Sequence, residues 1–117
     1  MIKYTLLLPL LLCGNLHAAG LFDDYQWPKS AFDNDLDWAA YYTPKGNCLD
    51  FARAVHDKVP DSTIYAIEYY PVDHAVICYQ DVCVDNGTIS DGWFDRVDLT
   101  HYKVLGTVKT EGDNAIL

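Results

Sequence analysis

Two β-prone segments separated by a two-residue turn constrain the fold of this chain more than any other feature. Residues 73–79 and 82–85 are rich in β-branched and aromatic side chains, and Gln80-Asp81 stands between them, which is the spacing of a two-residue β-hairpin. In that register Cys78 lies opposite Cys83 as a non-hydrogen-bonded pair, with Cα atoms about 4.5 Å apart. The sequence therefore predicts a hairpin closed by a Cys78–Cys83 disulfide. Two alternatives stay open: two buried free thiols, and a longer loop with a shifted register, because Gln-Asp is not a strong turn dipeptide.

The N-terminal residues predict export. Residues 1–3 carry a positive charge, residues 4–13 are almost wholly apolar, and residues 16–19 end in two alanines. This is the pattern of a cleavable secretory signal, and its apolar run is too short to span a bilayer as a mature helix. We therefore predict a signal peptide over residues 1–19 and a mature domain over residues 20–117. The mature chain is expected to lack an integral membrane segment and to be periplasmic or secreted.

Charge and histidine spacing exclude two classes of partner. Seventeen acidic and eight basic residues leave a net charge of −9, which gives a phosphate backbone nothing to bind, so nucleic acid is not an expected partner. His56, His74 and His101 lack the spacing of a zinc site. The sequence predicts no metal and no cofactor, and it indicates no oligomeric state.

Cysteine counting leaves one thiol unpaired. Loss of the signal peptide removes Cys13 from the four cysteines of the chain, and an odd number then remains in a compartment where disulfides form. With the hairpin cysteines paired, the free thiol is Cys48. Asn47 is a good N-cap for a helix over residues 48–59 that Pro60 ends.

The position of Cys48 favours a reactive thiol. In the first turn of a helix, the helix dipole and the unpaired backbone N–H groups stabilise a thiolate. The alternative is a core cysteine that begins a helix, because Cys48 belongs to the apolar stripe of this segment.

The hairpin offers this thiol a base and an acid. Side chains alternate along a strand, so His74 shares a face with Cys78, and on the paired strand Asp85 is the diagonal neighbour of His74. Such neighbours lie about 7–8 Å apart at Cα, within reach of an imidazole and a carboxylate. A thiol, a base and an acid that orients the base form the arrangement of covalent acyl transfer.

These residues resemble a known family. The segments Gly46-Asn47-Cys48-Leu49-Asp50-Phe51-Ala52, His74-Ala75-Val76 and Val84-Asp85-Asn86 are similar to the Cys, His, Asp core of the bacterial transglutaminase-like cysteine peptidases, which have a papain-like fold. The resemblance covers residues 46–86. It implies that Cys48 is the nucleophile, that His74 is the general base and that Asp85 orients His74.

The chain departs from papain-like proteases in its oxyanion hole. No glutamine stands a few residues before Cys48 to donate a hydrogen bond to the developing oxyanion. The backbone N–H of Cys48 is one candidate donor, and the side chains of Tyr42, Gln26 or Tyr41 are others, among which the sequence does not select.

The remaining segments predict an α+β domain. Residues 35–42 are expected to form a short helix, residues 63–70 a strand and residues 102–108 a closing strand, while residues 93–99 are ambiguous. Two N-terminal helices packed on an antiparallel sheet of four strands follow from this order. Together with the resemblance, this indicates a small papain-like, transglutaminase-like domain.

Two function classes follow. The first is an exported thiol hydrolase or acyltransferase that acts on an amide bond of a peptide or protein substrate. The second is a non-catalytic exported binding or inhibitory module on the same scaffold, because a fold does not by itself imply an activity.

Overall fold

The computed structural model describes residues 26–87 and 93–111. The chain divides into two compact units, and the boundary along the sequence falls between Asp35 and Leu36. The described part of the first unit contains a 3₁₀ helix, η1 (Lys29–Ala31), which the sequence analysis did not predict. The predicted signal peptide, residues 1–19, lies outside the described residues. In the part of the chain that is described, no helix has both the length and the apolar character needed to cross a membrane.

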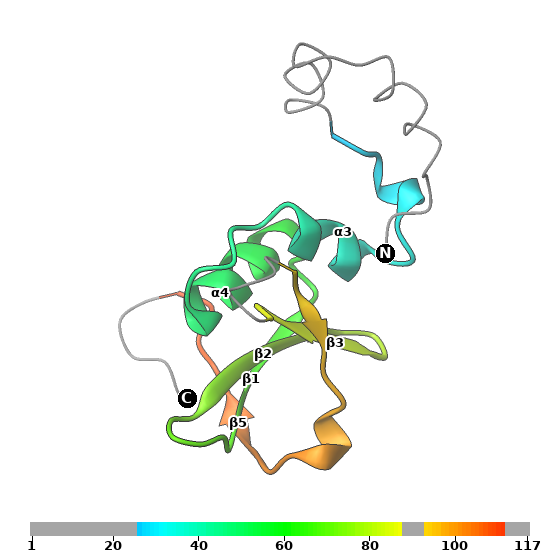
Figure 1. Ribbon diagram of the computed structural model, residues 1–117. Coiled ribbons are helices and arrows are strands. Elements are labelled where there is room, and N and C mark those ends of the chain that lie inside the picture. The colour runs from blue at the N-terminus through cyan, green and yellow to red at the C-terminus, as the bar shows by residue number, and fades with distance from the viewer. Residues whose placement is uncertain (1–25, 88–92, 112–117) are drawn as a thin grey trace. The chain divides into compact units, whose positions relative to one another are not determined.

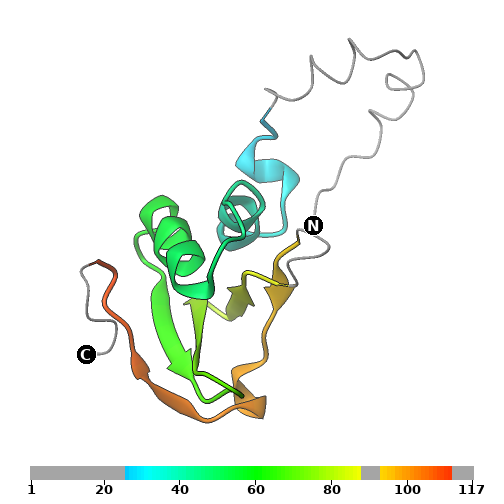
Figure 2. The ribbon, with the colours of Figure 1, turned by 60° about the vertical axis from the view of Figure 1, so that its left-hand side comes forward.

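The second unit contains two helices and an antiparallel sheet (Figures 1 and 2). In chain order its elements are α3 (Asp35–Tyr41), α4 (Cys48–Lys58), β1 (Thr63–Ile67), β2 (His74–Tyr79), β3 (Val82–Asp85), β4 (Asp95–Arg96), η2 (Leu99–His101) and β5 (Val104–Thr107). The five strands are ordered β4-β3-β2-β1-β5, and every pair is antiparallel. The prediction of an α+β domain with helices on an antiparallel sheet is confirmed. The sheet gains a fifth strand because part of the ambiguous segment pairs with β3 as β4.

The β2–β3 hairpin has the predicted register. Tyr79 pairs with Val82 and Cys78 pairs with Cys83, and the two cysteines form the predicted disulfide. Gln80, the first turn residue, has a φ of 55°, a left-handed conformation that lets two residues reverse the chain. The alternatives of free thiols and of a shifted register are thereby excluded in this structure.

Local signals fix both ends of α4. The Asn47 side chain accepts a hydrogen bond of 2.8 Å from the Asp50 backbone N–H, and its amide donates one of 2.8 Å to the Asp50 carboxylate. The first of these bonds satisfies one of the free backbone N–H groups of the first turn, and the second holds the capping side chain in place. At the other end Val59 caps the helix, and Pro60 follows it.

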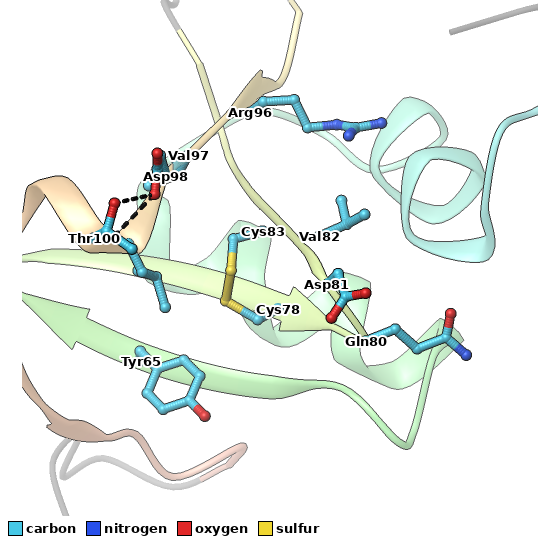
Figure 3. A pocket seen from close by; sticks show the side chains of 11 residues that line it. Tyr65, Cys78, Gln80, Asp81, Val82, Cys83, Arg96, Val97, Asp98 and Thr100 are labelled. Carbon is cyan, nitrogen blue, oxygen red and sulfur yellow. Dashed lines mark hydrogen bonds between the residues drawn. A yellow bond between two sulfur atoms is a disulfide. The ribbon is translucent and has the colours of Figure 1, made fainter.

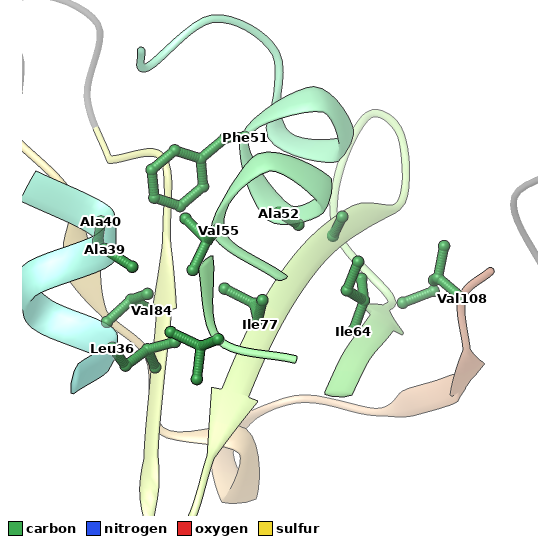
Figure 4. Packing of buried hydrophobic residues seen from close by; sticks show 13 residues of the cluster. Leu36, Ala39, Ala40, Phe51, Ala52, Val55, Ile64, Ile77, Val84 and Val108 are labelled. Atoms are coloured by element: carbon green, nitrogen blue, oxygen red, sulfur yellow. The ribbon is translucent and has the colours of Figure 1, made fainter. Parts of the chain in front are cut away.

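The core lies between the helices and one face of the sheet (Figure 4). Phe51, Ala52 and Val55 of α4 are buried, since they recur on one side of the helix. They pack in one cluster with buried side chains of the other elements, namely Leu36, Ala39, Ala40, Ile64, Ala66, Ala75, Ile77, Val84 and Val108. The other face of the sheet carries a smaller cluster of Ile67, Val76 and Cys78. The core thus fixes α4, and with it Cys48, against the centre of the sheet.

Candidate active site

Cys48 is the first residue of α4, and its thiol points toward the start of β2. The side chain is half-buried, and Cys48 is the free cysteine of the described residues. The backbone N–H of Ala75 donates to the Cys48 Sγ at 3.5 Å. Because Ala75 follows His74 directly in β2, this contact brings the thiol beside the predicted base.

His74 and Asp85 form the predicted pair. The His74 Nε2 lies 2.8 Å from the Asp85 Oδ2, and the two side chains are only 18% and 17% exposed. The other carboxylate oxygen of Asp85 accepts a hydrogen bond of 2.9 Å from the Gly87 backbone N–H. The carboxylate is therefore held from two sides, and it holds the imidazole in turn.

The imidazole also contacts the thiol, and this changes the pKa of both groups. The hydrogen bond to Asp85, and after it the one to Cys48, raises the pKa of His74 from its ordinary 6.5 to about 9, against the opposing effect of burial. The hydrogen bond from His74 lowers the pKa of the Cys48 thiol, and the Ala75 N–H adds to this effect, while burial opposes it. Both shifts act in the direction that favours a thiolate–imidazolium pair.

The loop before Cys48 is anchored by contacts that the sequence analysis missed. Asn86, only 8% exposed, donates from its amide to the Gly46 carbonyl at 2.7 Å and to the Lys45 carbonyl at 3.3 Å. The Lys45 ammonium donates to backbone carbonyls at the end of α3, at 2.8 Å to Ala40 and at 2.7 Å to Thr43. Asp85 and Asn86 are adjacent, so the end of β3 positions both the base and the loop that carries the nucleophile.

An aromatic side chain covers part of the base. The Tyr69 ring lies 5.1 Å from the His74 ring, centroid to centroid, and the Tyr102 ring lies 6.0 Å from Tyr69. Tyr69 is 51% exposed. An aromatic face near an imidazolium is favourable, since the ring quadrupole attracts a cation.

A small cleft opens beside the thiol. It has a volume of about 130 Å³, and Cys48 and His74 line it together with Leu49, Ala66, Asp73, Ala75 and Val108. A larger hollow of about 550 Å³ includes Tyr65, the disulfide and Thr100 in its lining (Figure 3). Its disulfide belongs to the cluster on the sheet face opposite the α4 core. The smaller cleft is the candidate active site, because it contains the free thiol.

Tyr41 and Tyr42, two of the predicted side-chain donors to an oxyanion, are not among the residues that line this cleft. The backbone carbonyl of Tyr42 accepts a hydrogen bond from Lys58, the last residue of α4, whereas Cys48 is the first. The Tyr41 ring packs edge-on against the Tyr42 ring. Gln26 belongs to the first compact unit, and its role stays a prediction. The sequence analysis missed the hydrogen bond from the Ala75 backbone N–H to the Cys48 Sγ, because no side-chain pattern reveals a backbone group that points at a thiol.

No group of three or more His, Cys, Asp or Glu side chains within residues 26–87 and 93–111 is arranged to hold a metal ion. No protein-family model, curated protein or solved structure matches this chain. The assignment of a function therefore depends on the geometry of Cys48, His74 and Asp85, together with the sequence resemblance.

Proposed function

We propose that this protein is an exported thiol hydrolase or acyltransferase that acts on an amide bond of a peptide or protein. The single observation that carries the proposal is the arrangement of Cys48, His74 and Asp85. The thiol and the imidazole line the same cleft, and the imidazole lies 2.8 Å from a carboxylate that is itself held by a backbone N–H. The resemblance of residues 46–86 to transglutaminase-like cysteine peptidases supports the same roles.

The acylation step follows from the charge of the pair. The Cys48 thiolate attacks the amide carbonyl carbon, and the His74 imidazolium donates its proton to the nitrogen of the leaving amine. The C–N bond breaks, a thioester forms on Cys48, and His74 becomes neutral. Asp85 keeps the imidazole oriented and stabilises its charged form.

Deacylation regenerates the enzyme. Neutral His74 takes a proton from a water molecule or from a second amine, which attacks the thioester carbonyl. The products are a carboxylic acid in hydrolysis or a new amide in acyl transfer, and Cys48 leaves as a thiolate beside imidazolium. The same residues thus serve both reactions, and the accepting molecule decides between them.

Two backbone groups are suited to stabilise the oxyanion. The N–H groups of Cys48 and Ala75 both act on the thiol, and both lower its pKa. During the reaction the negative charge moves from the Cys48 sulfur to the carbonyl oxygen of the substrate. These backbone N–H groups can then donate hydrogen bonds to that oxygen. A backbone pair would explain why the chain needs no glutamine before Cys48.

The disulfide supports an exported location. Disulfides persist outside the cytoplasm, and the Cys78–Cys83 bond is formed in this structure. Together with the signal-like N-terminal sequence, it supports a periplasmic or secreted enzyme.

The proposal is tested with a proteome-derived peptide library and mass spectrometry of the new termini and new amides. Turnover should fall at least about 100-fold in Cys48→Ala and in His74→Ala, since a positioned base contributes about 10²–10⁴-fold. Asp85→Asn should lose less, because orientation is only part of the work of the base. His101→Ala is the matched control, since His101 is exposed and pairs with Asp98, and it should keep full activity.

The competing function makes the opposite prediction. A binding or inhibitory module would keep its biological effect in Cys48→Ala, because truncation of one thiol removes little contact area. An intact effect in that variant, with no amide turnover by the wild type, would contradict the enzyme proposal.

A further inference from the structure

The cleft beside Cys48 has a mostly apolar lining. Outside the thiol and the imidazole, four of its five other lining residues are apolar, namely Leu49, Ala66, Ala75 and Val108. Ala66, Ala75 and Val108 are each no more than 7% exposed. The cleft is thus built from α4, β1, the start of β2 and the end of β5, which are elements that the core holds in place.

The size of the cleft follows from its small residues. Alanine at positions 66 and 75 leaves space that a larger side chain would fill. The volume of about 130 Å³ gives room for about four groups of the size of a water molecule, at about 30 Å³ each. An aliphatic chain of about four non-hydrogen atoms fits this space.

The polarity of the lining residues limits the kind of chemical group that can bind in the cleft. The one carboxylate of the lining, Asp73, is exposed, whereas Ala66, Ala75 and Val108 are buried and apolar. A buried apolar wall offers no hydrogen bond to a polar group, and desolvation of such a group there is unfavourable. The carboxylate at the rim also disfavours an anionic group.

We propose that this cleft is the binding site for the acyl side of the substrate and that it selects a short, uncharged aliphatic group. This inference rests on the proposed function, since the acyl group becomes bonded to Cys48. In a peptide substrate the group would be an aliphatic side chain near the scissile carbonyl. Leu49, Ala66 and Val108 are then the residues that determine specificity.

The test uses p-nitrophenyl esters with acetyl, butyryl and octanoyl groups. Cys48 attacks the ester carbonyl, the thioester forms and p-nitrophenolate leaves, so absorbance gives the acylation rate and mass spectrometry identifies the acylated residue. Each rate is divided by the rate of free N-acetylcysteine with the same ester, which removes the intrinsic reactivity of the ester. Butyryl should react about fifteenfold faster than acetyl, because it buries two more methylenes and each gives about a fourfold gain. Octanoyl should fall below butyryl, since the cleft is too short for it.

Two variants change the cleft in opposite directions. Ala66→Val reduces the volume and should remove the preference for butyryl while acetyl still reacts. Val108→Ala enlarges the cleft and should move the optimum to longer chains, and it carries the test if Ala66→Val does not fold. Val104→Ala is the matched control, because Val104 is an exposed residue of β5, the strand that ends just before Val108, and does not line the cleft.

The outcomes separate this inference from the proposed function. Equal relative rates for all chain lengths, or an optimum that Val108→Ala does not move, would overturn the cleft assignment even if Cys48 is acylated. Failure of every ester to acylate Cys48, or acylation that His74→Ala leaves unchanged, would instead overturn the proposed function and this inference with it.

Discussion

At the scale of the residue, the feature that matters most is the contact between Cys48 and His74. The hydrogen bond from the His74 imidazole is the largest cause that lowers the pKa of the Cys48 thiol. The thiolate, and not the thiol, is the nucleophile. The protonation state of this pair therefore governs reactivity as a function of pH.

The first prediction is the pH profile of Cys48 alkylation by iodoacetamide. In the wild type the rate should reach half its plateau well below pH 9.0, the ordinary thiol pKa, since the lowered pKa leaves the thiolate populated at lower pH. In His74→Ala the midpoint should rise toward 9.0, because the largest cause of the shift is gone. A stopped assay with mass spectrometry measures the rates.

The control for this experiment is His101→Ala. His101 is 73% exposed and lies 3.5 Å from Asp98, so its loss should leave the midpoint unchanged. A midpoint that is the same in the wild type and in His74→Ala would mean that the imidazole does not act on the thiol, and Cys48 would then be a structural cysteine.

The sequence predicted the three residues of the candidate site better than it predicted the contacts that hold them in place. The sequence allowed the prediction of Cys48, His74 and Asp85, because a helix start and a hairpin register are local features. His74 was expected on the strand face that carries Cys78, and in the structure that face lies opposite the main core. It reaches the thiol because it is the first residue of β2, where the imidazole lies at the rim of the sheet. The contact of Asn86 with the loop before Cys48 bridges 40 residues of sequence, and no local pattern reveals it.

At the scale of the element, the end of β3 and the loop before α4 act as one support. The Asn86 amide donates to the carbonyls of Gly46 and Lys45. We predict that Asn86→Ala lowers the free energy of unfolding by about 1–3 kcal/mol, because it removes two part-buried hydrogen bonds that contribute about 0.5–1.5 kcal/mol each. Urea denaturation measures the loss, and the Cys48 alkylation midpoint should rise as the helix start loosens.

Asp57→Ala is the comparison for this variant. Asp57 is an exposed residue of α4, and surface changes of this kind stay within about 0.5 kcal/mol. A stability loss in Asn86→Ala no larger than that of Asp57→Ala would show that the amide does not anchor the loop.

The turn of the β2–β3 hairpin permits a stabilising change. Among the described residues, Gln80 is the non-glycine residue with a positive φ, and the left-handed conformation costs a side-chain residue about 1–2 kcal/mol. We predict that Gln80→Gly raises the free energy of unfolding by about 0.5–1 kcal/mol, since glycine adopts this φ without a steric penalty but loses more entropy on folding. Thermal unfolding followed by circular dichroism measures the gain.

Asp81, the neighbouring turn residue, tests whether the left-handed conformation of Gln80 is the cause of the stability gain. Asp81 is not among the residues with positive φ, so Asp81→Gly adds only chain entropy to the unfolded state and should lower stability. Equal effects of the two glycine substitutions would contradict the conformational explanation.

Prediction of the elements succeeded where the signals were local. The helix of Cys48 has a cap, an apolar stripe and a terminating proline, and the hairpin has a short turn between two β-prone segments. The order of the strands in the sheet could not be predicted from the sequence. β5 pairs with β1 at Ala66 and Gly106, and this is a contact between distant segments. The segment over residues 93–99 was ambiguous because β4 contains only Asp95 and Arg96, too few residues for a periodic pattern.

At the scale of the whole molecule, the sheet separates two regions. Its face toward the helices carries the main core, which fixes α4, and the opposite face carries the cluster around the disulfide. The base and its carboxylate are linked through the rim of the sheet and not through the disulfide. Stability and reactivity should therefore respond differently to loss of the disulfide.

The last prediction concerns this separation. Cysteines five positions apart in sequence close a short loop, so the double change Cys78→Ala and Cys83→Ala should lower the free energy of unfolding by about 2 kcal/mol, less than the roughly 3 kcal/mol of a fifteen-residue loop. The Cys48 alkylation midpoint should stay where it is in the wild type. Urea denaturation and the alkylation assay measure the two quantities on the same protein, and non-reducing peptide mapping of the wild type should find Cys78 joined to Cys83 with Cys48 free. A midpoint that rises as far as it does in His74→Ala would mean that the disulfide positions the base, and the two faces of the sheet would then be coupled.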